Sequence, residues 1–220
     1  MRNEQLTPLL IVLLTMGACA TTGTDGSGTA SSDAPTTRTE LLEDVQARGK
    51  YLVTVLGCGD CHSPKVIGPQ GPVPDPERQF GGHPASEQLP PIPTNASGWV
   101  LFSMGQTATV GPWGTSFAAN ITGDDTGIGN WSEEQFERAL RQGWSKGIEG
   151  TRKLLPPMPW PGYASLTDAD VHAIYTYLVS LPAVDNIVPL AIPPTKEGWV
   201  NYIRSARWRS STMSCSLMPD

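Results

Sequence analysis

Apolar residues recur at helical spacing in three separate parts of the chain, and these stretches predict the main helices. The predicted helices span residues 39–56, 132–142 and 167–181. Their apolar stripes are Leu41, Val45, Leu52, Val55 and Leu56 in the first, Phe136 and Leu140 in the second, and Val171, Ile174, Tyr175, Leu178 and Leu181 in the third. The pattern therefore favours a mainly α-helical core.

Residues typical of helix ends flank all three segments. The start signals are a capping box at Thr37–Glu40, Ser132 with Gln135, and Thr167 with Asp170. The stop signals are Gly143 after the second helix and Pro182 after the third. These signals set the predicted boundaries of the helical core.

Residues 63–118, between the first two helices, are rich in turn formers. Gly and Pro make up 18 of these 56 residues, so we predict a long Gly/Pro-rich loop insertion. Trp99 and Trp113 indicate that the insertion packs against other residues. Two interpretations stay open: a wall over the functional site that sets solvent access and partner choice, or a packed but inert decoration.

The first 18 residues are typical of a signal peptide. Arg2 precedes an apolar run from Leu6 to Met16 that is shorter than the roughly 20 residues a membrane-spanning helix needs. Small residues before Cys19 resemble the cleavage site of bacterial lipoproteins, which predicts lipidation of Cys19. The alternative is ordinary cleavage nearby, with Cys19 uninvolved. Either way, we expect export to an oxidising compartment.

Residues 19–38 form a predicted flexible tether, because 12 of the 19 residues from 20 to 38 are Ser, Thr or Gly. A lipidated Cys19 would then anchor a domain at residues 39–185 to the periplasmic side of a bacterial membrane. Residues 186–220 form a C-terminal extension. Its basic residues and a helical face of Trp199, Ile203 and Ala206 predict docking on its own domain, or on a membrane or partner.

Composition narrows the possible functions. A net charge of −6 provides no basic surplus for binding nucleic acid. With 39% hydrophobic and 16% charged residues, the chain is neither a polytopic membrane protein nor a highly charged disordered one. Only four Cys and three His are present. Of the Cys, Cys215 has no evident mate and is either a free thiol or a link to another chain.

Cys58, Cys61 and His62 form a C-x-x-C-H motif, the attachment signature of c-type haem. Two thiols separated by two residues on one helical turn can add to both haem vinyl groups, and the following His can bind the iron. A thioredoxin-like motif would require a strand before it, and a zinc site would require a second Cys or His pair. We expect one covalent haem c, with His62 Nδ1 donating to a backbone carbonyl near Pro64 or Pro69.

Four residues are candidates for the sixth iron ligand: Met104, Met158, His83 and His172. Met158 is favoured because three prolines stiffen its surroundings, in Pro156-Pro157-Met158-Pro159. The alternative for Met158 is a buried side chain that fills a gap. Met104 lacks such framing, His172 is expected to face solvent from its helix, and His83 is expected to be exposed in a loop.

Residues 39–185 resemble a class I bacterial cytochrome c, and more narrowly the single-haem periplasmic cytochromes and the haem domains of cytochrome subunits that serve membrane-bound dehydrogenases. The matching stretches are Gly49–Val53, Gly57–Pro64, Asn120–Thr122, Thr126–Gly129, Trp131–Glu134, Pro156–Pro159 and the third helix. The resemblance implies Met158 as the distal ligand. It also implies that the first and third helices cross at Gly49, with Tyr175 or Leu178 packed into the gap.

Asn120, Thr122 and Trp131 are candidates for hydrogen bonds to the haem propionates, since polar side chains on a loop can face that charge. An iron bound by both His62 and Met158 has no free position for a small substrate, so we predict an electron-transfer protein rather than an enzyme. Its partners would be a dehydrogenase, an oxidase or another cytochrome. Two alternatives stay open: a docked electron-entry subunit of one dehydrogenase complex, and a haem sensor or peroxidase-like enzyme with an open or labile sixth position.

Overall fold

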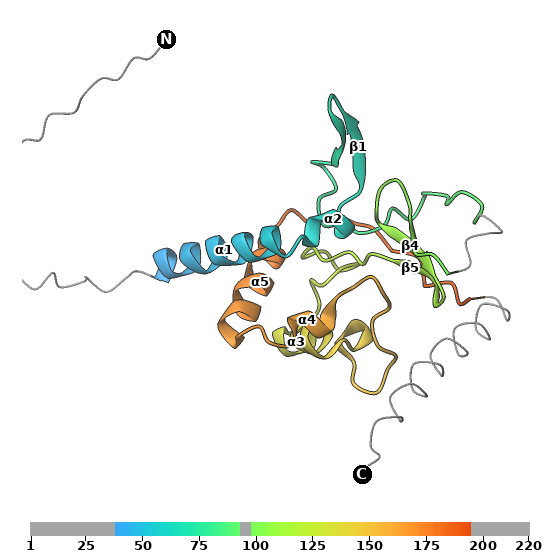
Figure 1. Ribbon diagram of the computed structural model, residues 1–220. Coiled ribbons are helices and arrows are strands. Elements are labelled where there is room, and N and C mark those ends of the chain that lie inside the picture. The colour runs from blue at the N-terminus through green and yellow to red at the C-terminus, as the bar shows by residue number, and fades with distance from the viewer. Residues whose placement is uncertain (1–37, 93–97, 195–220) are drawn as a thin grey trace, which may run out of the picture. The chain divides into compact units, whose positions relative to one another are not determined.

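The computed structural model describes residues 38–92 and 98–194, and helices form most of its core (Figure 1). The helices are α1 (Arg38–Val55), α2 (Cys58–His62), α3 (Glu133–Gln142), the 3₁₀ turn η1 (Ser145–Gly147), α4 (Trp160–Tyr163) and α5 (Asp168–Ser180). The strands are β1 (Lys65–Gly68), β2 (Gly71–Pro74), β3 (Leu101–Phe102), β4 (Ala108–Gly111) and β5 (Gly114–Phe117). The mainly helical class predicted from the sequence is confirmed, with a few short strands added.

Helices α1 and α5 cross closely at Gly49 (Figure 1). A Cβ atom at Gly49 would lie 2.0 Å from the carbonyl oxygen of Ala173 and 2.6 Å from the Cβ of Tyr177. The expected crossing is therefore present, but Ala173 and Tyr177 meet the glycine, not Tyr175 or Leu178. A mid-helix glycine costs roughly 1 kcal/mol of helix stability, and here it permits backbone contact that any side chain would block.

The main hydrophobic core joins α5 to the inner faces of α1 and α3. Its most buried members are Val53, Ile128, Ile174 and Leu178, each at most 2% exposed. Leu41, Leu42 and Val55, by contrast, are about half exposed, so only part of the predicted apolar stripe of α1 packs inward. The haem-attachment motif on α2 follows α1 directly, so this core carries it.

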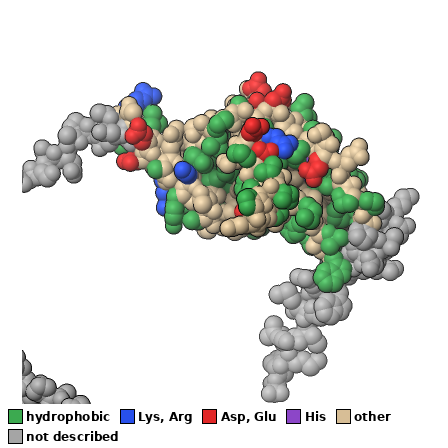
Figure 2. Space-filling view, turned by 90° about the horizontal axis from the view of Figure 1, so that it is seen from above, with side chains coloured by type: hydrophobic (Ala, Val, Ile, Leu, Met, Phe, Trp, Pro, Cys, Tyr) green, Lys and Arg blue, Asp and Glu red, His purple; other side chains and the backbone are tan. Residues whose placement is uncertain are grey.

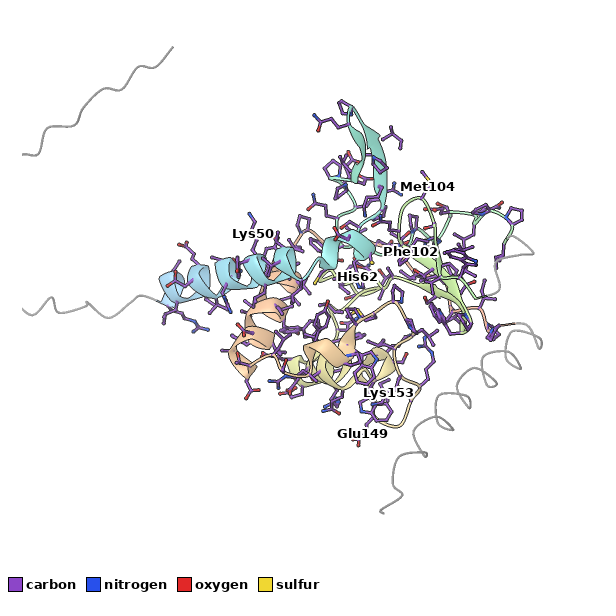
Figure 3. All side chains as sticks on the ribbon, viewed as in Figure 1. Lys50, His62, Phe102, Met104, Glu149 and Lys153 are labelled. Atoms are coloured by element: carbon purple, nitrogen blue, oxygen red, sulfur yellow. The ribbon has the colours of Figure 1, made fainter. Side chains whose placement is uncertain are left out.

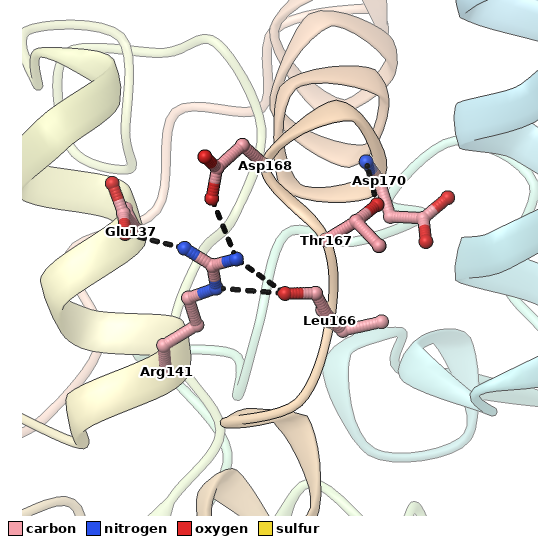
Figure 4. Close-up of polar contacts among 6 residues, drawn as sticks. All are labelled: Glu137, Arg141, Leu166, Thr167, Asp168 and Asp170. Atoms are coloured by element: carbon pink, nitrogen blue, oxygen red, sulfur yellow. Dashed lines mark hydrogen bonds and ion pairs between the residues drawn. The ribbon is translucent and has the colours of Figure 1, made fainter.

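Arg141 ties α3 to the start of α5 (Figure 4). Its guanidinium forms ion pairs with Glu137 at 2.6 Å and Asp168 at 2.7 Å, and it also donates to the carbonyl oxygen of Leu166. These carboxylates raise the pKa of Arg141 above its ordinary value. The turn between α4 and α5 is therefore fixed by one side chain that satisfies an otherwise unpaired carbonyl group.

The predicted caps of α3 and α5 are confirmed. The Ser132 hydroxyl accepts the backbone N–H of Gln135 at 3.2 Å, and Gly143 ends α3 in the left-handed conformation with φ of 69°. The Thr167 hydroxyl accepts the N–H of Asp170 at 3.1 Å. Helix α1 starts at Arg38, and its predicted capping residue Thr37 lies outside the described residues.

Segment 63–118 contains strands where the sequence predicted only loop. Antiparallel β1 and β2 form a hairpin in which Val66 faces Val73. Antiparallel β3, β4 and β5 form a second sheet, with Thr109 paired to Phe102 on one side and to Ser116 on the other. The prediction of a long Gly/Pro-rich loop missed these strands, because short strands with glycines at their turns satisfy backbone groups despite the high Gly and Pro content.

The C-terminal strap, residues 182–194, stays on the domain. The Asn186 amide donates to the carbonyl oxygens of Gly81 and His83 at 2.7 and 2.9 Å. Ile192 exchanges two backbone hydrogen bonds with Thr115 of β5, at 2.8 and 2.9 Å. The strap thus continues past the boundary predicted at residue 185. Trp199, Ile203 and Ala206, like Cys19 and Cys215, lie outside the described residues.

Among the described helices, none combines the length and apolar character required to cross a membrane. Apolar side chains are nevertheless common on the described surface, as Figure 2 shows for one face. Several of the most exposed belong to segment 63–118, including Ile67 at 80%, Trp99 at 68% and Met104 at 83%. The segment is therefore both folded and unusually apolar on its outside.

Candidate functional site

Helix α2 presents both motif cysteines and His62 within a single turn (Figure 3). Gly57, before the helix, has φ of 68°, a conformation that favours glycine and allows the sharp change of direction after α1. Cys58 and Cys61 are both free thiols and partly buried. The Lys65 ammonium secures the exit of the turn by donating to the carbonyl oxygens of Ser63 and Asp60 at 2.5 and 2.9 Å.

The environment of the thiols fits covalent haem attachment better than either rival interpretation. Burial raises the pKa of Cys58 to about 11 and also raises that of Cys61, whereas redox-active C-x-x-C motifs need a lowered thiol pKa. A helix, not a strand, precedes the motif. Within the described part of the chain, no group of three or more His, Cys, Asp or Glu could hold a metal ion such as zinc.

His62 is oriented by the backbone of a distant loop. Its Nδ1 donates to the carbonyl oxygen of Ala119 at 2.7 Å, which leaves Nε2 as the potential iron ligand. Burial lowers the pKa of His62, partly offset by that carbonyl, and so favours the neutral imidazole that binds metals. As expected, the acceptor is a backbone carbonyl. It belongs to Ala119, however, and not to a residue near Pro64 or Pro69.

Two extended segments hold this side of the site together. Backbone hydrogen bonds join Ile121 to Phe80 at 2.9 Å and His83 to Ala118 at 2.9 Å. Gly82 also donates to the carbonyl oxygen of His62 at 2.8 Å. The Ala119 carbonyl that orients His62 therefore lies in a segment whose neighbouring residues, Ala118 and Ile121, are held by main-chain bonds.

Asn120 and Thr122 form a buried hydrogen-bond network. The Asn120 amide donates to Thr126 Oγ1 at 3.1 Å and to the carbonyl oxygen of Val184 at 2.7 Å. Its oxygen accepts both the N–H and the hydroxyl of Thr122, at 3.0 and 2.8 Å. The two residues are 4% and 0% exposed. Both residues therefore help to hold the C-terminal strap at Val184, and their role toward the haem propionates stays a prediction.

Trp131 keeps a donor available. It packs at the edge of the core, and its carbonyl oxygen accepts the Tyr175 hydroxyl at 2.7 Å. Its indole N–H makes no hydrogen bond with the residues in the described ranges 38–92 and 98–194. Of the three residues suggested for the propionates, Trp131 alone retains a free polar group.

Met158 lies against the hydrophobic core, between short α4 and the end of the loop that follows α3. The loop is anchored where it starts, since Leu154 donates to the carbonyl oxygen of Gly143 at 2.7 Å. Lys153 lies 3.2 Å from the ring centre of Trp144 and donates to the Gln142 carbonyl at 2.7 Å (Figure 3). The loop that carries Met158 is therefore held to the end of α3.

Two other candidates for the sixth ligand are exposed, and for His172 this is the expected position. Met104 is 83% exposed in the turn between β3 and β4 (Figure 3). His172 is exposed on α5 and pairs with Glu133 at 2.9 Å. Neither residue belongs to the hydrophobic core that surrounds Met158.

His83 contradicts the expectation of an exposed loop residue, because it is 0% exposed. Its Nδ1 lies 2.9 Å from the Thr107 hydroxyl, and its ring lies 4.7 Å from that of Phe117, centre to centre. Burial lowers the pKa of His83. The second sheet covers the loop after Gly82, and the sequence showed no sign of that sheet.

Some contributing groups could not be found from the sequence. Ala119 acts through its carbonyl, which no side-chain pattern reveals. Tyr163 of α4 lies near the thiols: its hydroxyl donates to the Leu56 carbonyl at 3.4 Å, and burial beside Cys58 and Cys61 raises its pKa to about 12. Only its place shortly after the Met158 loop could have drawn attention to it.

Comparison with known proteins agrees with this site. The chain is 30% identical over 174 residues to the gluconate 2-dehydrogenase cytochrome c subunit of Pantoea cypripedii, covering 79% of this chain and 30% of that subunit. It is 41% identical over 80 residues to the fructose dehydrogenase cytochrome subunit of Gluconobacter japonicus, covering 36% of this chain and 16% of that subunit. It is also 36% identical over 109 residues to the cytochrome c subunit of alcohol dehydrogenase (quinone) of Gluconobacter oxydans. This match covers 49% of this chain and 21% of that subunit.

The attachment motif on α2, the oriented His62 and these similarities define a c-type cytochrome domain, an electron-transfer module that holds haem c covalently. More narrowly, the domain is homologous to cytochrome c subunits of dehydrogenases. The chain spans less than a third of the length of each of these three relatives. No protein-family model matches the sequence.

Proposed function

We propose that this protein is an exported, lipid-anchored cytochrome that carries single electrons from a dehydrogenase to a respiratory partner. The observation that carries the proposal is the position of His62, which is in the attachment turn and is oriented by the Ala119 carbonyl. When bound, haem c supplies an iron that accepts and donates one electron. The chain's own residues hold that group and control what reaches it.

On the proximal side, Cys58 and Cys61 would hold the haem through thioethers, and His62 Nε2 would bind the iron. Attachment by two bonds prevents loss of the group in an open compartment. The hydrogen bond from Nδ1 keeps the imidazole ring from rotating and increases the electron density on Nε2.

On the distal side, Met158 is the ligand we propose. It belongs to the edge of the core, whereas Met104 points into solvent and His172 is occupied by Glu133. A thioether stabilises the ferrous state and raises the reduction potential, as a carrier that accepts electrons from dehydrogenases requires. If His62 and Met158 both bound the iron, they would leave no site on it for small oxidants, so we favour a carrier over a peroxidase-like enzyme.

The partners follow from the relatives and from the surface. The similar proteins are named as dehydrogenase subunits, so we infer a dehydrogenase as electron donor. Exposed Ile67, Trp99 and Met104 provide the apolar contacts that protein interfaces use. The signal peptide and lipidated Cys19 predicted from the sequence would place this docking surface at the periplasmic face of a membrane.

Spectroscopy of the purified full-length protein tests the proposal. We expect pigment that resists extraction with acidified acetone and, in the oxidised protein, the weak far-red band of Met sulfur on ferric haem. Met158→Ala should remove the band and allow added imidazole to bind, while Met104→Ala should change neither. An extractable pigment would overturn covalent attachment, and an unchanged spectrum in Met158→Ala would overturn the assignment of the distal ligand.

A further inference from the structure

The Ser116 side chain of β5 reaches out of its sheet to the loop that carries Met158. Its hydroxyl donates to the carbonyl oxygen of Pro156 at 2.6 Å. The Ser116 hydroxyl oxygen also accepts the indole N–H of Trp113 at 3.3 Å, and the Thr109 carbonyl is a more distant second acceptor for the hydroxyl, at 3.4 Å. A Ser in the insertion thus contacts a residue two positions before the proposed iron ligand, 40 residues away in the sequence.

Residues 156–159, at the end of the Met158 loop, have few backbone groups that could hold their shape. Pro156, Pro157 and Pro159 lack an N–H, so Met158 is the one backbone donor between residues 156 and 159. That donor makes a 3.3 Å bond to the carbonyl oxygen of Leu155 within the same turn. The stretch therefore cannot secure itself through helix or strand bonds, and a hydroxyl from another element is what fixes the Pro156 carbonyl.

We propose that Ser116 is a positioning residue for Met158, and that the second sheet serves as a brace for the distal side of the haem site. This inference rests on the proposed ligation by Met158. Ser116 does not touch the iron. It limits the movement of the turn that presents the Met sulfur, so its loss makes the bond between sulfur and iron easier to break.

The same short segment also reaches the proximal side. Ala119, which accepts the hydrogen bond from His62, follows Ser116 by three residues, with Ala118 bound to the carbonyl of Thr107 at 2.8 Å between them. Residues 116–119, at the end of β5 and just after it, thus contact both sides of the site. Ser116 contacts the Met158 loop, and Ala119 accepts the hydrogen bond from His62. Segment 63–118, for which an inert role was possible, becomes part of the electron-transfer site.

Three variants of the full-length, haem-loaded protein test the proposal. Ser116→Ala removes the hydroxyl, and Ser116→Thr keeps it with a β-branched side chain that suits a strand. Ser103→Ala is the matched control, because its hydroxyl accepts the N–H of Ala108 at 3.2 Å in the same sheet but does not reach the Met158 loop. Each variant is titrated with imidazole, and the loss of the far-red band is followed.

We expect Ser116→Ala to lose its far-red band at about five-fold less imidazole than the wild type, the change for one lost hydrogen bond. Ser116→Thr should return to the wild-type affinity, and Ser103→Ala should match it even if thermal unfolding shows a lower stability. Equal imidazole affinity in Ser116→Ala and wild type overturns the brace and leaves the proposed function intact. A wild type without the far-red band instead removes the Met158 ligation on which the brace rests.

Discussion

The two sides of the site are built in different ways. His62 lies in a regular helical turn and is oriented by a main-chain carbonyl whose neighbouring residues are held by backbone bonds. Met158 lies in a loop with three prolines. Backbone bonds hold the start of this loop to the residues that follow α3, where Leu154 donates to Gly143. The stretch next to Met158 is instead contacted by a side chain from another element, the Ser116 hydroxyl.

Because of this difference, we expect mutations on the two sides of the site to change different properties of the protein. Replacing a side chain leaves the main-chain N–H and C=O groups of that residue in place. Mutations on the proximal side should therefore act mainly through the stability of the whole domain. Next to Met158, the contact from outside the loop is a single side chain, so the proposed ligation by Met158 should change with little effect on folding. Mutations confined to one side test whether stability and ligation respond separately.

The largest expected effect is that of Gly49→Ala, which disturbs the helical frame behind the attachment turn. The new methyl group would overlap the carbonyl oxygen of Ala173 and force α1 and α5 apart. We expect a loss of about 3 kcal/mol in the free energy of unfolding, the upper range for overpacking. Chemical denaturation of the haem-loaded protein measures it, and the far-red band of the folded fraction should be unchanged.

Gly162→Ala provides the control on the distal side. Gly162 is in α4, shortly after the Met158 loop, and a Cβ there meets no atom within 4 Å. Because alanine is the better helix former, this variant should be as stable as the wild type or more so. A large destabilisation by Gly162→Ala, or a negligible one by Gly49→Ala, would contradict the assignment of the rigid frame to the proximal side.

The next largest effect is expected in the polar loop that follows Ala119. Asn120→Ala removes four hydrogen bonds and leaves buried groups of Thr122 and the Val184 carbonyl without partners. We expect a loss of about 2 kcal/mol, with the far-red band retained. Asn130→Ala, at an exposed position, should have no measurable effect. Loss of the band in Asn120→Ala at unchanged stability would show that this loop serves the distal ligand instead.

The helical frame was predictable because its signals are local. The spacing of Val171, Ile174 and Leu178 follows from the helical period, and the caps Ser132 and Thr167 bond to residues three positions away. The attachment motif is also local, since its residues lie within one turn. The boundaries of α3 and α5 were consequently predicted to within one residue.

The second sheet and the contacts around the ligands depend on partners distant in sequence. Ser116 reaches Pro156 across 40 residues, and His62 reaches Ala119 across 57. His83 is buried because this sheet covers it, so its exposure could not be judged from its glycine neighbours. A high content of Gly and Pro excludes long regular elements, but it does not exclude two-residue turns between short strands.

The smallest predicted effect concerns the ion pair between α1 and α5, part of the proximal frame. Arg48 contacts Asp170 at 2.8 Å, and this contact holds the pKa of Asp170 below its ordinary value of 3.8. The lowered pKa means that the stabilisation is complete above that value and is lost as the pH falls through the lower, folded-state pKa. Asp170→Asn should therefore cost about 0.5 kcal/mol at neutral pH, as expected for a pair near the surface.

This cost should shrink towards zero on acidification, when the wild-type carboxyl group also becomes neutral. Unfolding in denaturant at a series of pH values measures the difference between Asp170→Asn and wild type, with Asp44→Asn on the exposed side of α1 as control. A difference that grows as the pH falls would contradict the ion pair. Because the Arg48 contact joins the two crossing helices and does not approach the Met158 loop, the far-red band should be the same in both proteins at neutral pH. A change in that band would mean that the proximal frame and the distal ligand are more tightly coupled than their separate contacts indicate.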